Sequence, residues 1–168
     1  TEAKLVWDGA ADGTMITSSS LVPLVQAQIL ISKVDPQDAD YVLDLHSPQF
    51  CLFDVEVMGG AADLTVMRWA ADATNTTGGY DNTRNAVYNV VKRLLSGICG
   101  TLLRLNGQAT GAVTLNTFIH IHTEDARVGG IILGSVGYVD NNVFLHVRIQ
   151  LGANIYFLAR ASLFSLST

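Results

Sequence analysis

The sequence predicts a mainly β protein, an antiparallel β-sandwich or jelly-roll-like domain of about eight to ten strands with one inserted amphipathic helix. Two observations predict the strands. Apolar and polar residues alternate along most of the chain, and turn clusters of Gly, Asn, Asp and Pro recur at intervals of roughly 8–15 residues. The third observation is helical spacing of apolar residues, found only over about residues 83–98. One helix does not fit βαβ repetition, which would produce a parallel sheet.

The strands of the first half are predicted by period-2 alternation. A short strand precedes the turn pairs Asp8-Gly9 and Asp12-Gly13, and Gly59-Gly60 is interpreted as a tight hairpin turn between two strands. A polar, Gly-containing loop follows over 71–82. The longer strands of this half are expected over 21–34, 41–46, 49–58 and 62–70.

The predicted helix begins near Thr83 and ends at Gly97 or Gly100. Its apolar stripe consists of Val87, Val91, Leu94, Leu95 and Ile98. After it, strands are expected over 101–105, 110–124, 128–139, 141–152 and 154–168.

Bulk composition bounds the architecture and the partners. The 168 residues predict a single β-rich domain over 1–168, without an internal repeat or a linker. Only 15% of the residues are charged, which favours a surface with apolar interfaces and therefore a homo-oligomer. The net charge of −5 and the lack of a basic patch argue against direct nucleic acid binding. No run of roughly 20 apolar residues predicts membrane insertion, and no signal-peptide pattern is seen at the start.

The two cysteines, Cys51 and Cys99, are expected to be buried free thiols that pack as small apolar groups. A single disulfide between them is the alternative if the compartment is oxidising.

The candidate metal ligands are His120, His122, Glu124 and His146. Residues two apart on a strand share a face, so the first three would project together, with His146 on a neighbouring strand. Three imidazoles and a carboxylate suit zinc, iron or manganese. The pattern resembles the metal motif of cupins, which implies a metal-dependent β-barrel enzyme. The alternative is that all four are ordinary polar-face residues.

Other chemistry finds little support in the motifs. The chain lacks G-x-S-x-G, a P-loop and a dinucleotide-binding glycine pattern, so neither an enzyme nor a bound cofactor is expected. Trp7 and Trp69 could stack on a sugar ring, as in a lectin, or could anchor a core or an interface.

One short segment has a local likeness. Residues Lys4–Thr14, KLVWDGAADGT, resemble a segment of the small head-decoration proteins of tailed phages. The resemblance implies a structural component of a virion.

These observations favour a structural, self-assembling subunit, a viral or phage capsid, decoration or spike protein located in the virion. Its partners would be copies of itself and other virion proteins. The residues expected at the interface are Val143, Leu145, Val147, Ile149, Ile155 and Phe157. A secreted, lectin-like β-sandwich that binds a ligand or glycan is the first alternative, and the cupin-like enzyme is the second.

Overall fold

The fold is all β throughout the part of the chain that the structure describes. A computed structural model describes residues 5–6, 13–18, 22–71, 85–107, 111–134 and 138–151. The strands are β1 (Leu5–Val6), β2 (Thr14–Thr17), β3 (Gln28–Asp35), β4 (Tyr41–His46), β5 (Leu52–Val57), β6 (Thr65–Ala71), β7 (Ala86–Val87), β8 (Val90–Gly107), β9 (Ala112–Thr114), β10 (Thr117–Leu133), β11 (Tyr138–Asp140), β12 (Val143–Phe144) and β13 (Val147–Leu151).

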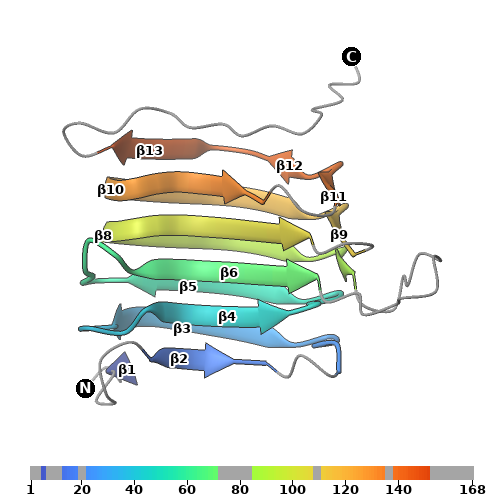
Figure 1. The fold of residues 1–168 in the computed structure, drawn as a ribbon, viewed down its shortest axis with the longest axis horizontal. Coiled ribbons are helices and arrows are strands. Elements are labelled where there is room, and N and C mark those ends of the chain that lie inside the picture. The colour runs from blue at the N-terminus through green and yellow to red at the C-terminus, as the bar shows by residue number, and fades with distance from the viewer. Residues whose placement is uncertain are drawn as a thin grey trace.

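The strands wind into a β-solenoid of about 4 turns, in which every described pair is parallel (Figure 1). Face 1 consists of β1, β3, β5, the first part of β8 and β10, and then β12 and β13. Face 2 consists of β2, β4, β6 and the second part of β8 and β10. The short strands β7, β9 and β11 form face 3.

Three of the four steps between successive turns have nearly the same length. Along face 1, Gln28 aligns with Leu52, Leu52 with Val90, Val90 with Thr117, and Thr117 with Val143. The steps between these partners are 24, 38, 27 and 26 residues. The longest step contains residues 72–84, which lie outside the described residues. The chain therefore has an internal repeat, and the prediction of none was wrong.

The predicted antiparallel sandwich or jelly roll is wrong, because each strand pairs with the strand one turn away and not with its neighbour in sequence. Alternation shows which side chains face a core, but it is the same for parallel and antiparallel pairing when one sheet face is buried. The jelly-roll fold that the cupin likeness implied is wrong for the same reason.

The predicted helix over 83–98 is also wrong, since this segment holds β7 and the start of β8. From Val91 to Cys99, the buried residues of β8 are Val91, Leu94, Ser96 and Cys99, which follow one another at steps of three, two and three. The register between β5 and β8 shifts at Lys92, and β8 passes from face 1 to face 2 between Ser96 and Thr101. Because of these two irregularities, the buried side chains no longer recur at every second residue. Their spacing instead resembles that of the apolar face of a helix.

Gly59-Gly60 does not form the predicted hairpin, because β5 and β6 lie on different faces and each pairs with β8. Glycine is needed at Gly60 and Gly100 because the backbone of the neighbouring turn passes too close for a side chain. A Cβ on Gly60 would lie 2.0 Å from the carbonyl oxygen of Ile98, and one on Gly100 would lie 2.7 Å from that of Ala62. Two successive corners therefore pack backbone against backbone.

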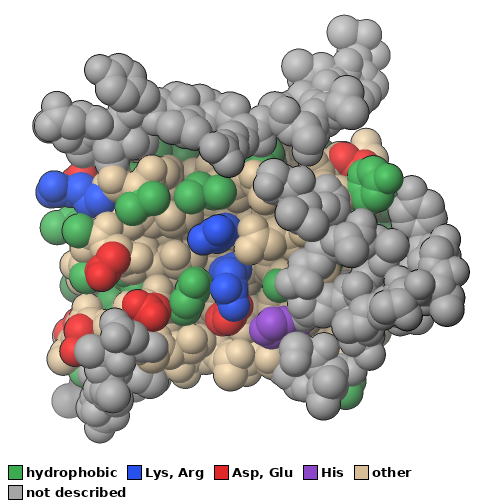
Figure 2. Space-filling view, in the orientation of Figure 1, with side chains coloured by type: hydrophobic (Ala, Val, Ile, Leu, Met, Phe, Trp, Pro, Cys, Tyr) green, Lys and Arg blue, Asp and Glu red, His purple; other side chains and the backbone are tan. Residues whose placement is uncertain are grey.

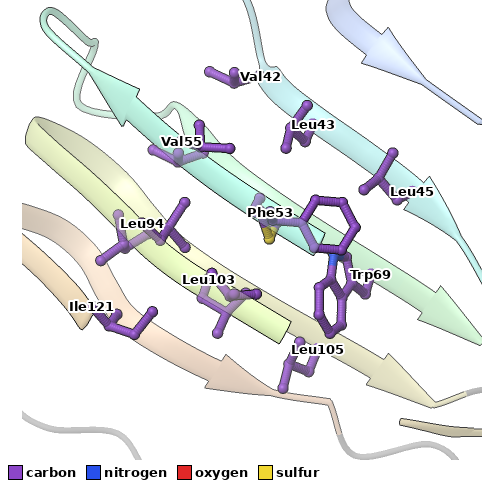
Figure 3. Packing of buried hydrophobic residues seen from close by; sticks show 14 of the residues in the cluster. Val42, Leu43, Leu45, Phe53, Val55, Trp69, Leu94, Leu103, Leu105 and Ile121 are labelled. Atoms are coloured by element: carbon purple, nitrogen blue, oxygen red, sulfur yellow. The ribbon is translucent and has the colours of Figure 1, made fainter. Parts of the chain in front are cut away.

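The core lies between faces 1 and 2 and is filled by aliphatic and aromatic side chains (Figure 3). Phe53, Val91, Phe118 and Phe144 are aligned across the turns of face 1. Trp69 enters from face 2, with its ring centroid 5.3 Å from that of Phe53 and 5.2 Å from that of Phe118. The indole ring thus fills the space between Phe53 and Phe118, where the intervening turn of face 1 provides only the small side chain of Val91.

A buried asparagine ladder locks the register at the corner between faces 3 and 1. The backbone N–H and the Nδ2 of Asn89 donate to Oδ1 of Asn116, at 3.0 and 2.9 Å. The same two groups of Asn116 donate to Oδ1 of Asn142, at 3.1 and 2.9 Å. The backbone N–H of Cys51 donates to Oδ1 of Asn89, so the ladder reaches a fourth turn.

Replacement of Trp69 tests how the core is packed. Trp69→Ala should lower the free energy of unfolding by about 3–5 kcal/mol, because it leaves a large cavity. Trp69→Phe should cost less than about 1.5 kcal/mol, because the indole N–H has no hydrogen-bond partner in the described residues and its loss offsets the lost volume. Urea unfolding measures both, and equal costs would contradict this account of the site.

Replacement of Asn116 tests the ladder. Asn116→Ala should lower the free energy of unfolding by about 4 kcal/mol, since buried groups on Asn89 and the carbonyl of Ala86 lose their partners. Asn142→Ala should cost less than half as much, because Asn142 is only partly buried and water can replace its side chain. Urea unfolding of the two variants provides the comparison, and equal losses would show that burial does not set the cost.

Candidate functional site

The structure brings together two of the four predicted metal ligands. His120 lies on β10 and His146 lies just before β13, with their ring centroids 6.5 Å apart. His122 is in register with Arg148, whose guanidinium carries no lone pair for a metal. Within the described residues, no three side chains of His, Cys, Asp or Glu are placed to hold a metal ion. A metal site that uses His120, His122, Glu124 and His146 stays a prediction from the sequence alone.

The predicted interface strand is interrupted. Val143 lies in β12, and Val147 and Ile149 lie in β13. Leu145 and His146 lie between the two strands, where His146 has a φ of 49°. Val143, Leu145 and Val147 are exposed, whereas Ile149 packs against the core, so these four do not share one face as expected. Ile155 and Phe157 lie outside the described residues.

A second apolar surface, which the sequence did not predict, lies at the ladder corner. The residue before each ladder position has a positive φ: 55° at Gln26, 54° at Phe50, 56° at Tyr88, 57° at Leu115 and 49° at Asn141. The left-handed conformation turns the chain at each of the five points where the described chain passes this corner. It is unfavourable for bulky side chains, at a cost of about 1 kcal/mol each.

The side chains at these turning positions point into solvent. Phe50 is 56% exposed, Tyr88 53% and Leu115 46%, and Val25 beside Gln26 is 51% exposed. The rings of Phe50 and Tyr88 stack on adjacent turns, with centroids 5.2 Å apart and an interplanar angle of 17°. We call Val25, Phe50, Tyr88 and Leu115 the corner ridge.

The corner carries no charge over four turns. Residues 25–28, 49–52, 87–90 and 114–117 contain no Asp, Glu, Lys or Arg. Large apolar side chains in an uncharged setting are typical of the centre of a protein interface. The ridge is therefore a surface suited to protein contact.

The sequence contains a pattern that marks this corner, because similar residue pairs recur one solenoid turn apart. Tyr88-Asn89, Leu115-Asn116 and Asn141-Asn142 recur at steps of 27 and 26 residues, and each is followed two positions later by a core residue, Val91, Phe118 or Phe144. A search for internal repeats would have found it. Alternation alone could not, because the turning position breaks the period of two.

Both cysteines are free and buried, as predicted, and no disulfide joins them. Cys51 occupies the position of the ladder asparagines one turn before Asn89, and Cys99 lies at the corner where β8 changes face. Burial raises the pKa of both thiols above the ordinary value. Their thiolates are therefore less populated at neutral pH than those of exposed cysteines.

The raised pKa values predict slow reaction of the thiols. At pH 8, labelling of Cys51 and Cys99 by iodoacetamide should be at least about 100-fold slower in the folded protein than in urea, because the reactive thiolate is both rare and covered. Mass spectrometry after timed quenching measures the rate at each cysteine. Rapid labelling of either one without denaturant would contradict its burial.

The sugar-stacking alternative loses one of its two tryptophans. Trp69 lies in the core, with no exposed surface, and Trp7 lies outside the described residues. No described element is a helix with the length and apolar character needed to cross a membrane.

No family model, curated protein or solved structure matches this chain. The likeness of Lys4–Thr14 to phage decoration proteins thus gains no family support.

Proposed function

We propose that this protein is a structural solenoid subunit that assembles with copies of itself through the corner ridge. The observation that carries the proposal is the outward stack of Phe50 and Tyr88, continued by Leu115, at strained turning positions in successive turns. Bulky side chains in a left-handed conformation destabilise the single chain. Burial of the same side chains against a partner would offset that cost.

A second copy is the partner that fits the ridge best. Each copy has a net charge of −5, so two copies repel each other except where they meet over an uncharged surface. Parallel strands place ridge side chains at a regular spacing of about 4.8 Å. A second ridge has the same spacing, so its side chains can interdigitate with the first set along the whole corner.

The proposal is confined to self-assembly. The virion location and the virion partners stay predictions from composition. The exposed Val143 and Leu145 lie in the turn beyond Leu115 and extend the apolar surface at that end.

Asparagine substitutions test the ridge without damage to the corner. The triple variant Phe50→Asn, Tyr88→Asn, Leu115→Asn removes the apolar side chains and introduces the residue that Asn141 already provides at this position. Asn tolerates positive φ, so the single chain should keep or gain stability, by up to about 3 kcal/mol in total. Light scattering should give a multiple of 18.0 kDa for the wild type and 18.0 kDa for the variant.

A matched control removes the same number of exposed apolar residues elsewhere. Leu30→Asn, Met58→Asn, Val128→Asn changes residues that are 59–60% exposed but lie off the ridge, and it should leave the assembly intact. A wild type of 18.0 kDa at all accessible concentrations would overturn the proposal. Equal dissociation of the control and the ridge variant would overturn the choice of surface.

A further inference from the structure

Two arginines lie side by side on face 2. The register of β6 and β8 aligns Arg68 with Arg104, so their strands place them about 4.8 Å apart. Figure 2 shows Lys and Arg side chains at the centre of the face turned to the viewer, beside an acidic and a His side chain. Two guanidinium groups at this distance repel each other unless anions lie near them.

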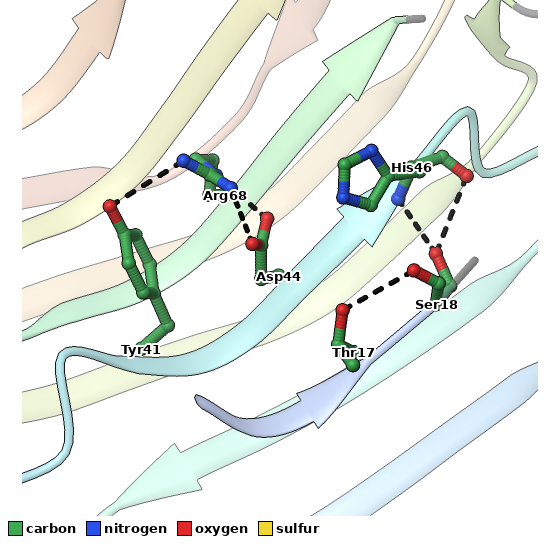
Figure 4. Close-up of polar contacts among 6 residues, drawn as sticks. All are labelled: Thr17, Ser18, Tyr41, Asp44, His46 and Arg68. Atoms are coloured by element: carbon green, nitrogen blue, oxygen red, sulfur yellow. Dashed lines mark hydrogen bonds and ion pairs between the residues drawn. The ribbon is translucent and has the colours of Figure 1, made fainter. Parts of the chain in front are cut away.

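Arg68 is neutralised within the fold (Figure 4). Its Nε donates to Oδ1 of Asp44 at 2.7 Å, and its Nη2 donates to Oδ2 of the same carboxylate. The guanidinium carbon lies 4.7 Å from the ring centroid of Tyr41, whose hydroxyl is 3.5 Å from Nη1. Asp44 is buried and fixes Arg68 as a planar, preorganised donor group.

Arg104 lacks such a partner in the described residues. Its side chain is exposed, and no described carboxylate lies within ion-pair distance of it. The next residue in register, Ile132, is uncharged, and so are Leu102 and Asn106, its neighbours two positions away along β8. Asp44 therefore offsets one of the two adjacent positive charges and leaves the other open to solvent.

We propose that Arg104, supported by Arg68 and Asn106, binds an oxyanion group, a carboxylate, sulfate or phosphate carried by a ligand. The guanidinium fork of Arg104 matches two oxygens of such a group. Asn106 lies two residues along β8 and presents an amide on the same face. Because the whole chain is acidic, general attraction of anions is weak, so binding has to come from the charge of Arg104, which no described carboxylate offsets, and from the hydrogen-bond donors beside it.

The site lies on face 2, whereas the ridge lies at the corner of faces 3 and 1. Its test is therefore independent of self-assembly, and the same protein serves for both.

The probes are sodium sulfate, sodium phosphate and sodium acetate, titrated against sodium chloride at constant ionic strength. NMR of the Arg104 Nε–Hε resonance reports binding at the site. The wild type should show a saturable shift, and Arg104→Lys, which keeps the charge but loses the fork, should bind several-fold more weakly. A preference for sulfate and phosphate over acetate, or the reverse, supports the site and identifies the ligand group.

A matched variant on face 1 controls for the simple loss of one positive charge. Arg104→Gln should weaken binding by at least about tenfold when it is measured by calorimetry. Arg148→Gln removes the same charge from an exposed position on face 1 and should change affinity by less than about twofold. Equal losses in the two variants, or a wild-type resonance that moves only with ionic strength, would overturn the proposal.

Discussion

The register between turns is the constraint on which the rest of the structure depends, and the buried asparagine ladder enforces it. A parallel strand pair could slip by two residues and keep its faces, since side chains alternate with a period of two. Three asparagines prevent this. Asn116 and Asn142 each accept two hydrogen bonds from the turn before, and Asn89 accepts one. Asn89 and Asn116 are buried, so water cannot replace these bonds there. A slip would leave several buried polar groups unpaired.

The ladder and the corner ridge are consequences of one backbone shape. To point Asn116 inward just before a strand, the chain turns at Leu115 with a positive φ, and this turn directs the Leu115 side chain outward. The same coupling holds for Tyr88 and Asn89. The same backbone turn therefore sets the direction of both the inward and the outward side chain. The fold does not require the outward side chain to be apolar. Asn141 shows that a polar residue serves there equally well.

The sequence predicts the strands better than it predicts their partners. Tyr41–His46 was expected with the same bounds that β4 has, and β5 and β6 fall within or next to their expected segments. Local alternation is sufficient for this, because it reports burial of one face. Pairing depends on residues 24 to 38 positions apart, such as Leu52 and Val90, and no local pattern contains that information. At Lys92 the register shifts, and at Gly97-Ile98 the strand changes face. The local apolar spacing there resembles a helix, and the helix prediction was wrong for this reason.

The direction of the ladder also bears on how copies can associate. Each ladder residue donates its N–H to the next turn, so Asn142 at the last described turn presents an N–H that has no ladder acceptor among the described residues. The first described turn holds Ala27 at the corresponding position, and its side chain has no oxygen. If two copies were stacked so that these two turns met directly, Ala27 would offer Asn142 no side-chain acceptor, and the side-chain ladder would not continue across the junction. Lateral contact along the ridge does not involve the hydrogen bonds of the ladder, and it buries the side chains that the single chain leaves exposed.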